Sequence, residues 1–188
     1  DLASLVDAYV ENGLPEQAKH YFDRFGDVLD KNSKLPDLLV QLGASLGNEG
    51  DLNEAGRRFQ QAIQADPQNA GAHLQLSRVY LLQRNFAEAL RHATRAVELR
   101  QGYQEAHFVL ASLYEHEGKR DQVLEHLEAL VRSDPGSTKY RLLLGNAYAR
   151  EEQWNKAIEQ FRVAVETAPD RAETHLQLAL ALEVNGQR

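Results

Sequence analysis

Apolar residues recur at three- and four-residue steps through most of the chain, in runs of about a dozen residues. One run contains Leu74 and Val79, and the next contains Phe86 and Leu90. Steps of this size place the side chains on one face of an α-helix, because a helix turns once every 3.6 residues. All five prolines lie between such runs or at the start of one. The pattern therefore predicts an all-α protein whose helices are separated by short turns.

The helical pattern itself repeats every 34 residues. Counting back from Ala157 in steps of 34 gives Val123, Ala89 and Ala55. Counting back from Leu144 in the same way gives Leu110, Leu76 and Leu42. This period is typical of a solenoid in which each unit is a pair of helices packed on its neighbours. We expect four complete units at residues 36–69, 70–103, 104–137 and 138–171, with a partial unit at 1–32 and a terminal helix at 172–184.

Residues 142–169 show the repeating unit most completely. They contain, in order, Leu144, Gly145, Tyr148, Ala157, Phe161, Ala164 and Pro169. This order follows the consensus W-x2-L-G-x2-Y, A-x3-F and P, although Arg141 stands where the Trp belongs. The stretch resembles a tetratricopeptide repeat (TPR). The resemblance implies that residues 1–188 are a single TPR domain, a solenoid of antiparallel helix hairpins that forms a right-handed superhelix.

Small residues at one position of the first helix suggest close helix packing. The position is occupied by Gly43, Ser77, Ala111, Gly145 and Ala179. Small side chains let two helices approach so that Phe59 and Phe161 can fill the gap beside them. In the unit 104–137 the second helix has Val123 and Leu127 in place of the small and aromatic residues. We therefore expect a wider helix spacing in that unit.

Composition narrows the possible partners. The net charge of -7 argues against nucleic-acid binding, which requires a concentrated basic face. The chain has no cysteine, and no apolar run approaches the length of a membrane span. The absence of methionine and the excess of Arg over Lys predict a segment truncated from a larger bacterial protein. Either the cytoplasm or the periplasm is compatible with this composition.

Seven histidines are the most obvious candidates for chemistry. His73, His107 and His175 share one position of the first helices, and His92 and His126 share one position of the second helices. Equivalent residues of successive units should lie about 10 Å apart, too far to bind one metal ion. We interpret the histidines as structural or solvated and predict no metal or cofactor site. No catalytic motif occurs, so we do not expect an enzyme.

The first helices carry the residues most informative about a ligand, because their inner faces line a concave groove in proteins that this chain resembles. The fifth position of each unit is apolar, and the ninth and twelfth positions are mixed. The predicted groove residues are Val40, Leu74, Arg78, Leu81, Phe108, Ser112, Glu115, Leu142, Asn146 and Leu176.

Two interpretations of the apolar fifth position remain open. These side chains form the floor of a groove that binds an amphipathic helix or an apolar extended peptide, or they are buried between first helices and belong to the core. A subclass of the family clamps a peptide's terminal carboxylate with cations, but Leu74, Phe108 and Leu142 replace the cation at this position. A carboxylate clamp is therefore not expected.

The resemblance implies a non-catalytic protein–protein interaction scaffold that binds a peptide or helix, within a bacterial complex for secretion, polysaccharide export or envelope assembly. The alternative is a self-assembling TPR module that forms homo-oligomers, since the terminal helix keeps the apolar pattern of the unit, as in Leu178 and Leu182. Both hypotheses predict a protein or peptide partner, without nucleic acid and without membrane insertion by this segment.

Overall fold

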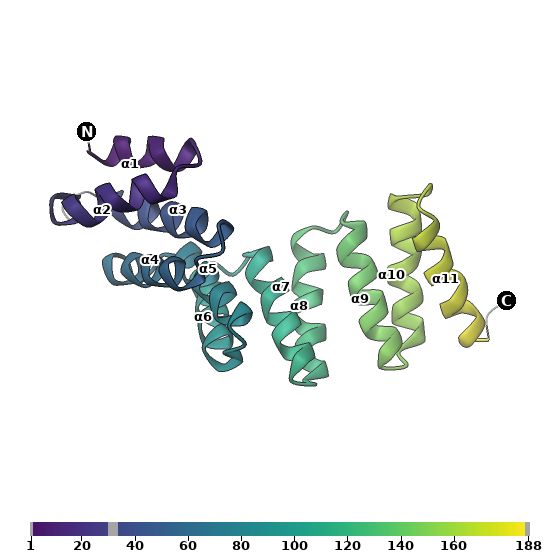
Figure 1. Cartoon of the computed structure of the whole chain (residues 1–188). Helices are drawn as coiled ribbons and strands as arrows, with labels where there is room; N and C mark the ends of the chain where they lie inside the picture. The colour runs from purple at the N-terminus through teal and green to yellow at the C-terminus, as the bar shows by residue number, and fades with distance from the viewer. Residues whose placement is uncertain (1, 30–33, 187–188) are drawn as a thin grey trace. The chain divides into compact units, whose positions relative to one another are not determined.

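The computed structural model describes residues 2–29 and 34–186, and within these ranges it contains eleven α-helices and no strand. The helices are α1 (Leu2–Glu11), α2 (Pro15–Leu29), α3 (Leu35–Asn48), α4 (Leu52–Ala65), α5 (Ala70–Leu82), α6 (Phe86–Leu99), α7 (Gln104–His116), α8 (Arg120–Ser133), α9 (Thr138–Arg150), α10 (Trp154–Thr167) and α11 (Ala172–Val184) (Figure 1). This confirms the predicted all-α fold. No helix among the described residues has the length and apolar character needed to cross a bilayer.

Helix ends coincide with residues that satisfy free backbone groups. The side chain of Asp51 accepts a hydrogen bond from the backbone N–H of Glu54 at 3.0 Å and so caps the start of α4. Asn69 caps α5 in the same way. Gly50 and Gly118, which follow α3 and α7, have φ angles of +95° and +69°, and a side chain would be strained in this conformation. The short turns between helices therefore follow from local sequence.

The chain forms two compact units, one up to residue 101 and one from residue 102 onward. In the first unit α3 packs against α4, α4 against α5, and α5 against α6, while α1 and α2 pack on α3. In the second unit α7 packs against α8, α8 against α9, and α9 against α10, and α11 packs on α10. Each predicted 34-residue unit contains one helix pair (Figure 1). The connection at residues 30–33 lies outside the described residues.

Two hairpins are closed by a glycine that faces a phenylalanine. A Cβ atom added at Gly43 of α3 would lie 2.7 Å from Cε1 of Phe59 in α4, and one added at Gly145 of α9 would lie 2.8 Å from Cδ1 of Phe161 in α10. Both phenylalanines are almost fully buried. The predicted role of the small residues is thereby confirmed, because only glycine leaves room for the ring.

The hairpins α5–α6 and α7–α8 are filled differently. Ser77 occupies the position of the glycine in α5, and its hydroxyl donates to the carbonyl of Ala89 at 2.7 Å. In α7–α8 the corresponding residues are Ala111 and Leu127, which are 5% and 6% exposed. Since Leu127 is smaller than a phenylalanine, this hairpin is the place to look for unfilled space.

Candidate functional site

A pocket opens in the second unit between α7, α8 and α9. It consists of two adjoining hollows of about 380 and 170 Å³, which share the lining residues Glu115, Val123, Ala147 and Arg150. Leu127 lines the smaller hollow at the position where Phe161 seals the next hairpin. The atypical second helix of the unit 104–137 thus coincides with open space rather than with a closed core.

The smaller hollow is lined mainly by apolar side chains. These are Phe108, Ala111, Val123, Leu127, Leu143 and Ala147. Phe108 is 41% exposed, and the Nζ atom of Lys139 lies 4.9 Å from the centre of its ring, within range of a cation–π contact. Ser112 and Asn146 add a hydroxyl and an amide to the same hollow. The pocket therefore offers an apolar surface together with groups that can bond to a peptide backbone.

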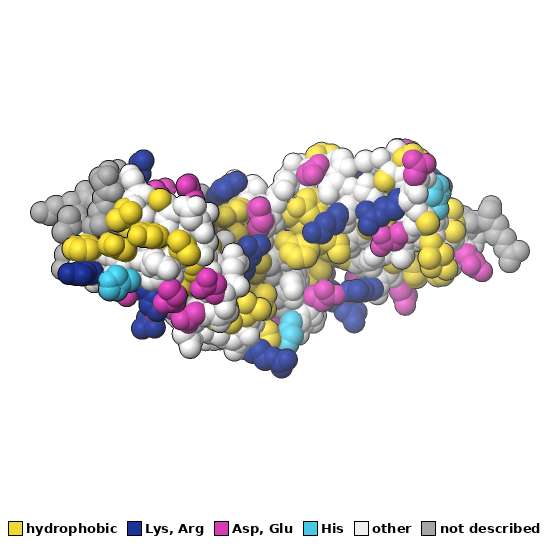
Figure 2. Space-filling view, turned by 45° about the horizontal axis from the view of Figure 1, so that its top comes forward, with side chains coloured by type: hydrophobic (Ala, Val, Ile, Leu, Met, Phe, Trp, Pro, Cys, Tyr) yellow, Lys and Arg dark blue, Asp and Glu magenta, His cyan; other side chains and the backbone are white. Residues whose placement is uncertain are grey.

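Two ion pairs border the pocket. Arg150 of α9 pairs with Glu115 of α7, and Arg120 of α8 pairs with Glu151 at 3.2 Å. Both pairs connect neighbouring helices, and their formal charges cancel. Charged side chains of both signs surround hydrophobic patches on the face drawn in Figure 2. These two ion pairs therefore add no net charge to the edge of the pocket, where Lys139 beside Phe108 contributes one positive charge.

Four of the ten predicted groove residues line this pocket: Phe108, Ser112, Glu115 and Asn146. Two others are core residues, since Leu74 is 1% and Leu142 is 5% exposed. The remaining four do not line it: Arg78 is exposed, Val40 and Leu81 are half-buried, and Leu176 on α11 is 57% exposed. The apolar fifth position is thus divided between core and surface, so neither of the two interpretations applies to all of it.

Several lining residues did not emerge from sequence reasoning as ligand-contacting positions. Val123 and Leu127 stood out only as unusual packing residues, although their departure from the Ala and Phe of other units was the available signal. Arg150 follows Glu115 by 35 residues, and pairing of opposite charges on consecutive first helices could have been anticipated from that spacing. Leu143 carries no distinguishing signal in the sequence.

A related hollow of about 290 Å³ lies in the first unit between α4 and α5. Several of its lining residues lie 68 positions, or two repeats, before residues that line the larger hollow. They include Leu52, Gly56, Val79 and Gln83. Its edge has a neutral amide contact, since Gln83 donates to Asn53 at 3.3 Å. The repeat therefore creates a hollow at equivalent positions in both units, but the ion pairs beside it differ. In the second unit they connect two helices, whereas Arg57 at the hollow of the first unit pairs with Glu54 of its own helix.

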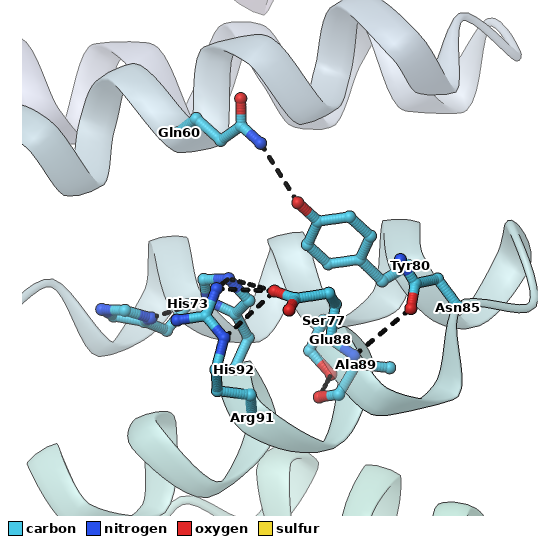
Figure 3. Close-up of polar contacts among 9 residues, drawn as sticks. All are labelled: Gln60, His73, Ser77, Tyr80, Asn85, Glu88, Ala89, Arg91 and His92. Carbon is cyan, nitrogen blue, oxygen red and sulfur yellow. Dashed lines mark hydrogen bonds and ion pairs between the residues drawn. The ribbon is translucent and has the colours of Figure 1, made fainter.

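Four histidines form pairs that sequence reasoning missed. Nδ1 of His73 lies 2.9 Å from Nδ1 of His92 across α5 and α6 (Figure 3), and Nδ1 of His107 lies 3.0 Å from Nδ1 of His126 across α7 and α8. The 34-residue period relates equivalent histidines of successive units, whereas these contacts lie between the two helices of one hairpin. Within the described residues no group of three or more His, Asp or Glu side chains is arranged to hold a metal ion.

Comparisons with known proteins agree with the repeat pattern. One family model described as tetratricopeptide repeat matches residues 48–92 and 80–147, and a second with the same description matches residues 142–187. No curated protein sequence is similar enough to the chain to count as a match.

Several solved structures have a similar fold. MamA from Desulfovibrio magneticus RS-1, solved from residue 41 to its end, is 23% identical with a TM-score of 0.71, over 92% of this chain and 98% of the solved chain. YrrB, described as a TPR protein with an unusual peptide-binding site, is 24% identical with a TM-score of 0.71, over 98% of this chain and 90% of YrrB. Pseudomonas aeruginosa pilF is 18% identical with a TM-score of 0.74, over 100% of this chain and 84% of pilF. At these identities the likeness shows the fold.

Proposed function

The chain belongs to the tetratricopeptide repeat family, and we propose that it is a non-catalytic scaffold that binds an apolar side chain of a partner peptide between α7, α8 and α9. The observation that carries this proposal is the pocket beside Leu127, at the position where the neighbouring hairpin has a buried phenylalanine. An apolar side chain from a partner would occupy space that an aromatic residue of the chain itself fills elsewhere. Burial of such a side chain is a favourable source of binding energy.

The polar groups of the pocket favour an extended peptide over a small apolar molecule. The amide of Asn146 can both donate and accept, and the hydroxyl of Ser112 can do the same. Both residues lie beside the apolar lining, so a peptide could bond to them while one of its side chains enters the hollow. The peptide-binding site named for YrrB is consistent with this class of ligand. Bacterial secretion, polysaccharide export or envelope assembly is the setting that we propose from the family resemblance.

Blocking the mouth of the pocket tests this function. A random peptide library is panned on the protein, and the dissociation constant of the best peptide is measured by fluorescence anisotropy. Ser112 is exposed, so Ser112→Arg should leave the fold intact while its long side chain obstructs the hollow. We expect it to weaken binding at least about tenfold.

The matched control is Gln122→Arg, which adds the same charge at an exposed position of α8. It should change the dissociation constant less than about twofold, because one exposed charge alters binding little. Equal binding by the Ser112→Arg variant and the wild type would overturn the proposal.

A second candidate function is self-assembly through α11. Leu176, Leu180 and Val184 follow one another at four-residue steps and are 57%, 47% and 61% exposed. They form an apolar stripe on one face of the helix, and exposed stripes of this kind favour association. Sedimentation equilibrium should then show oligomers that Leu180→Glu dissociates and Glu183→Gln does not. A wild-type protein that remains monomeric at high concentration would contradict this candidate.

A further inference from the structure

Two consecutive hairpins contain the same cluster of two histidines and one tyrosine. In each, a histidine of the first helix is followed by a tyrosine seven residues later and by a second histidine 19 residues later. The ring of Tyr80 stacks on His92 with the centres 5.6 Å apart, and the ring of Tyr114 stacks on His126 with the centres 5.5 Å apart. The clusters connect α5 with α6 and α7 with α8. A contact that occurs twice at the same repeat positions is a property of these units and not an isolated rotamer.

The hydrogen-bond partners of the first pair determine which nitrogen atoms carry protons; Figure 3 shows His73, His92 and Arg91 among them. Nε2 of His73 lies 3.3 Å from the carbonyl oxygen of Pro67, which can only accept, so this nitrogen donates. In the neutral ring Nδ1 of His73 then accepts, and Nδ1 of His92 must donate to it. Nε2 of His92 is left to accept from Nη2 of Arg91 at 3.0 Å. The chain of bonds is complete with both imidazoles neutral.

Neither imidazole of this pair can take up an additional proton without losing a hydrogen bond. Protonation of His73 at Nδ1 would bring two N–H groups together, and protonation of His92 at Nε2 would bring an N–H group against Arg91. His73 and His92 are 7% and 5% exposed, so water cannot easily replace the lost bonds. Protonation therefore costs free energy in the closed hairpin.

The surrounding charges act mostly in the same direction. Burial lowers the pKa of His73, the hydrogen bond to the carbonyl of Pro67 opposes this shift, and Arg95 and Arg91 lower the pKa further. Burial, together with Arg91 and His73, lowers the pKa of His92 to about 4. Glu88 opposes this shift, but its carboxylate lies 3.9 Å from His92 and is bonded to Arg91 at 2.6 Å. The adjacent α4 contributes the neutral amide of Gln60, which donates to Tyr80.

The second pair has a similar environment. Burial lowers the pKa of His126, His107 lowers it further, and Glu125 of the same helix opposes the shift. Lys119 lies 5.6 Å from the centre of the Tyr114 ring. From α9, which packs against α8, Tyr148 donates to Glu128. Here too, a cation would have to form at a largely buried contact between helices.

We propose that the two imidazole pairs are acid-sensitive contacts between helices. They stabilise the packing of α5 on α6 and of α7 on α8 at neutral pH, and this stabilisation is lost under mildly acidic conditions. The hairpin α9–α10 provides the contrast, because Nη1 of Arg141 donates to Oε1 of Gln160 at 2.6 Å at the equivalent positions. Neither side chain of that pair changes its charge near neutral pH. If the pocket beside Leu127 binds peptide, acidification also weakens that binding; this consequence alone rests on the proposed function.

The direction of the pH effect follows from linkage. His73, His92 and His126 have lowered pKa values in the closed hairpins and an ordinary pKa of about 6.5 in the opened ones. The opened state therefore binds more protons as the pH falls. The stabilisation is complete above about pH 6.5 and is lost progressively as the pH falls toward the lowered pKa.

Amide hydrogen exchange measured on the whole chain tests the proposal. Protection factors, which remove the intrinsic pH dependence of exchange, are compared at about pH 7.5 and about pH 5.5. Protection in α5–α6 and α7–α8 should fall about tenfold for each histidine that stays neutral in the closed state. Protection in α9–α10 should change by less than about threefold. An equal loss in all three hairpins, or no loss in any, would overturn the proposal.

A variant that copies the contact of α9–α10 provides a second criterion. His107→Arg with His126→Gln should remove the pH response of α7–α8 and leave that of α5–α6 unchanged. If the double variant does not fold, His126→Phe keeps an aromatic ring against Tyr114 without a titrating group and should reduce the response. A pH response of α7–α8 that is as large in the variant that folds as in the wild type contradicts the proposal. Peptide binding by the wild type at neutral pH is measured separately, so a failure of the proposed function remains distinguishable.

Discussion

The hairpins α7–α8 and α9–α10 follow the same backbone plan but differ in what fills the space between their helices. In α9–α10 the ring of Phe161 lies directly against Gly145 and is 1% exposed. In α7–α8 the same two positions hold Leu127 and Ala111, and Leu127 lines an open pocket. Two side chains therefore distinguish a closed structural unit from one with room for a ligand.

The same two hairpins also differ in the polar contact between their helices. Arg141 and Gln160 connect α9 and α10 with a bond that does not titrate near neutral pH. His107 and His126 occupy these positions in α7 and α8. The hairpin with the pocket is thus also one of those proposed to loosen in acid.

The largest difference between the hairpins should appear when the filling side chain is removed. Phe161→Ala leaves a cavity beside Gly145 and should lower the free energy of unfolding by about 3–5 kcal/mol. Leu127→Ala should cost about 2 kcal/mol, because Leu127 already borders an open pocket and its removal creates less enclosed void. Chemical denaturation followed by circular dichroism measures both values. Equal costs would mean that the two hairpins are filled equally well.

The close contact in α9–α10 should be sensitive to a single added methyl group. Gly145→Ala places a Cβ atom against the ring of Phe161 and should cost about 1–3 kcal/mol. Adding Phe161→Leu reproduces the Ala111 and Leu127 combination and should restore part of that stability. A double-mutant cycle measured by denaturation gives the coupling. Strictly additive costs would contradict the contact.

The reverse exchange should close the pocket. Ala111→Gly with Leu127→Phe transfers the filling of α9–α10 to α7–α8, and the affinity for the panned peptide should fall at least about tenfold, or about 1.4 kcal/mol. Fluorescence anisotropy measures the affinity, and circular dichroism checks that the helices remain. Leu127→Met, which nearly conserves volume, is the matched control and should retain most of the binding. Unchanged affinity in the filled variant would exclude the pocket as the binding site.

The smallest effect is expected at the edge of the pocket. Glu115 and Arg150 have side chains that are 57% and 69% exposed, so Glu115→Gln should change the free energy of unfolding by less than about 1 kcal/mol. The change should diminish further at high salt, which screens exposed charges. Denaturation at two salt concentrations measures it. A much larger loss would show that the ion pair, rather than the apolar filling, holds α7 and α9 together.

Most of the fold could be predicted because each structural requirement repeats along the chain. Gly145 and Phe161 identify a close contact from their types and spacing alone. The candidate site was predicted only in part: Ser112 and Asn146 line the pocket, whereas Leu142 lies in the core. Periodicity places an apolar residue on a helix face, but it does not reveal whether a neighbouring helix covers that face.

The histidine pairs illustrate a different limit. The 34-residue period relates each histidine to its equivalent in the next unit, but the contact lies across one hairpin, as between His107 and His126. A spacing of 19 residues on two antiparallel helices carries no simple geometric meaning until the turn between them is known. The recurrence of that spacing, with a tyrosine seven residues after the first histidine, was the available signal.

Methyl NMR of the whole chain, titrated with the panned peptide, tests the central claim most directly, because it reports where the ligand lies without altering the protein. Leucine and valine methyl groups are labelled and their chemical shifts are followed. The largest changes should occur at Val123, Leu127 and Leu143, which line the pocket. Largest changes at Leu176 and Leu180 of α11, with the pocket methyl groups unaffected, would contradict the account.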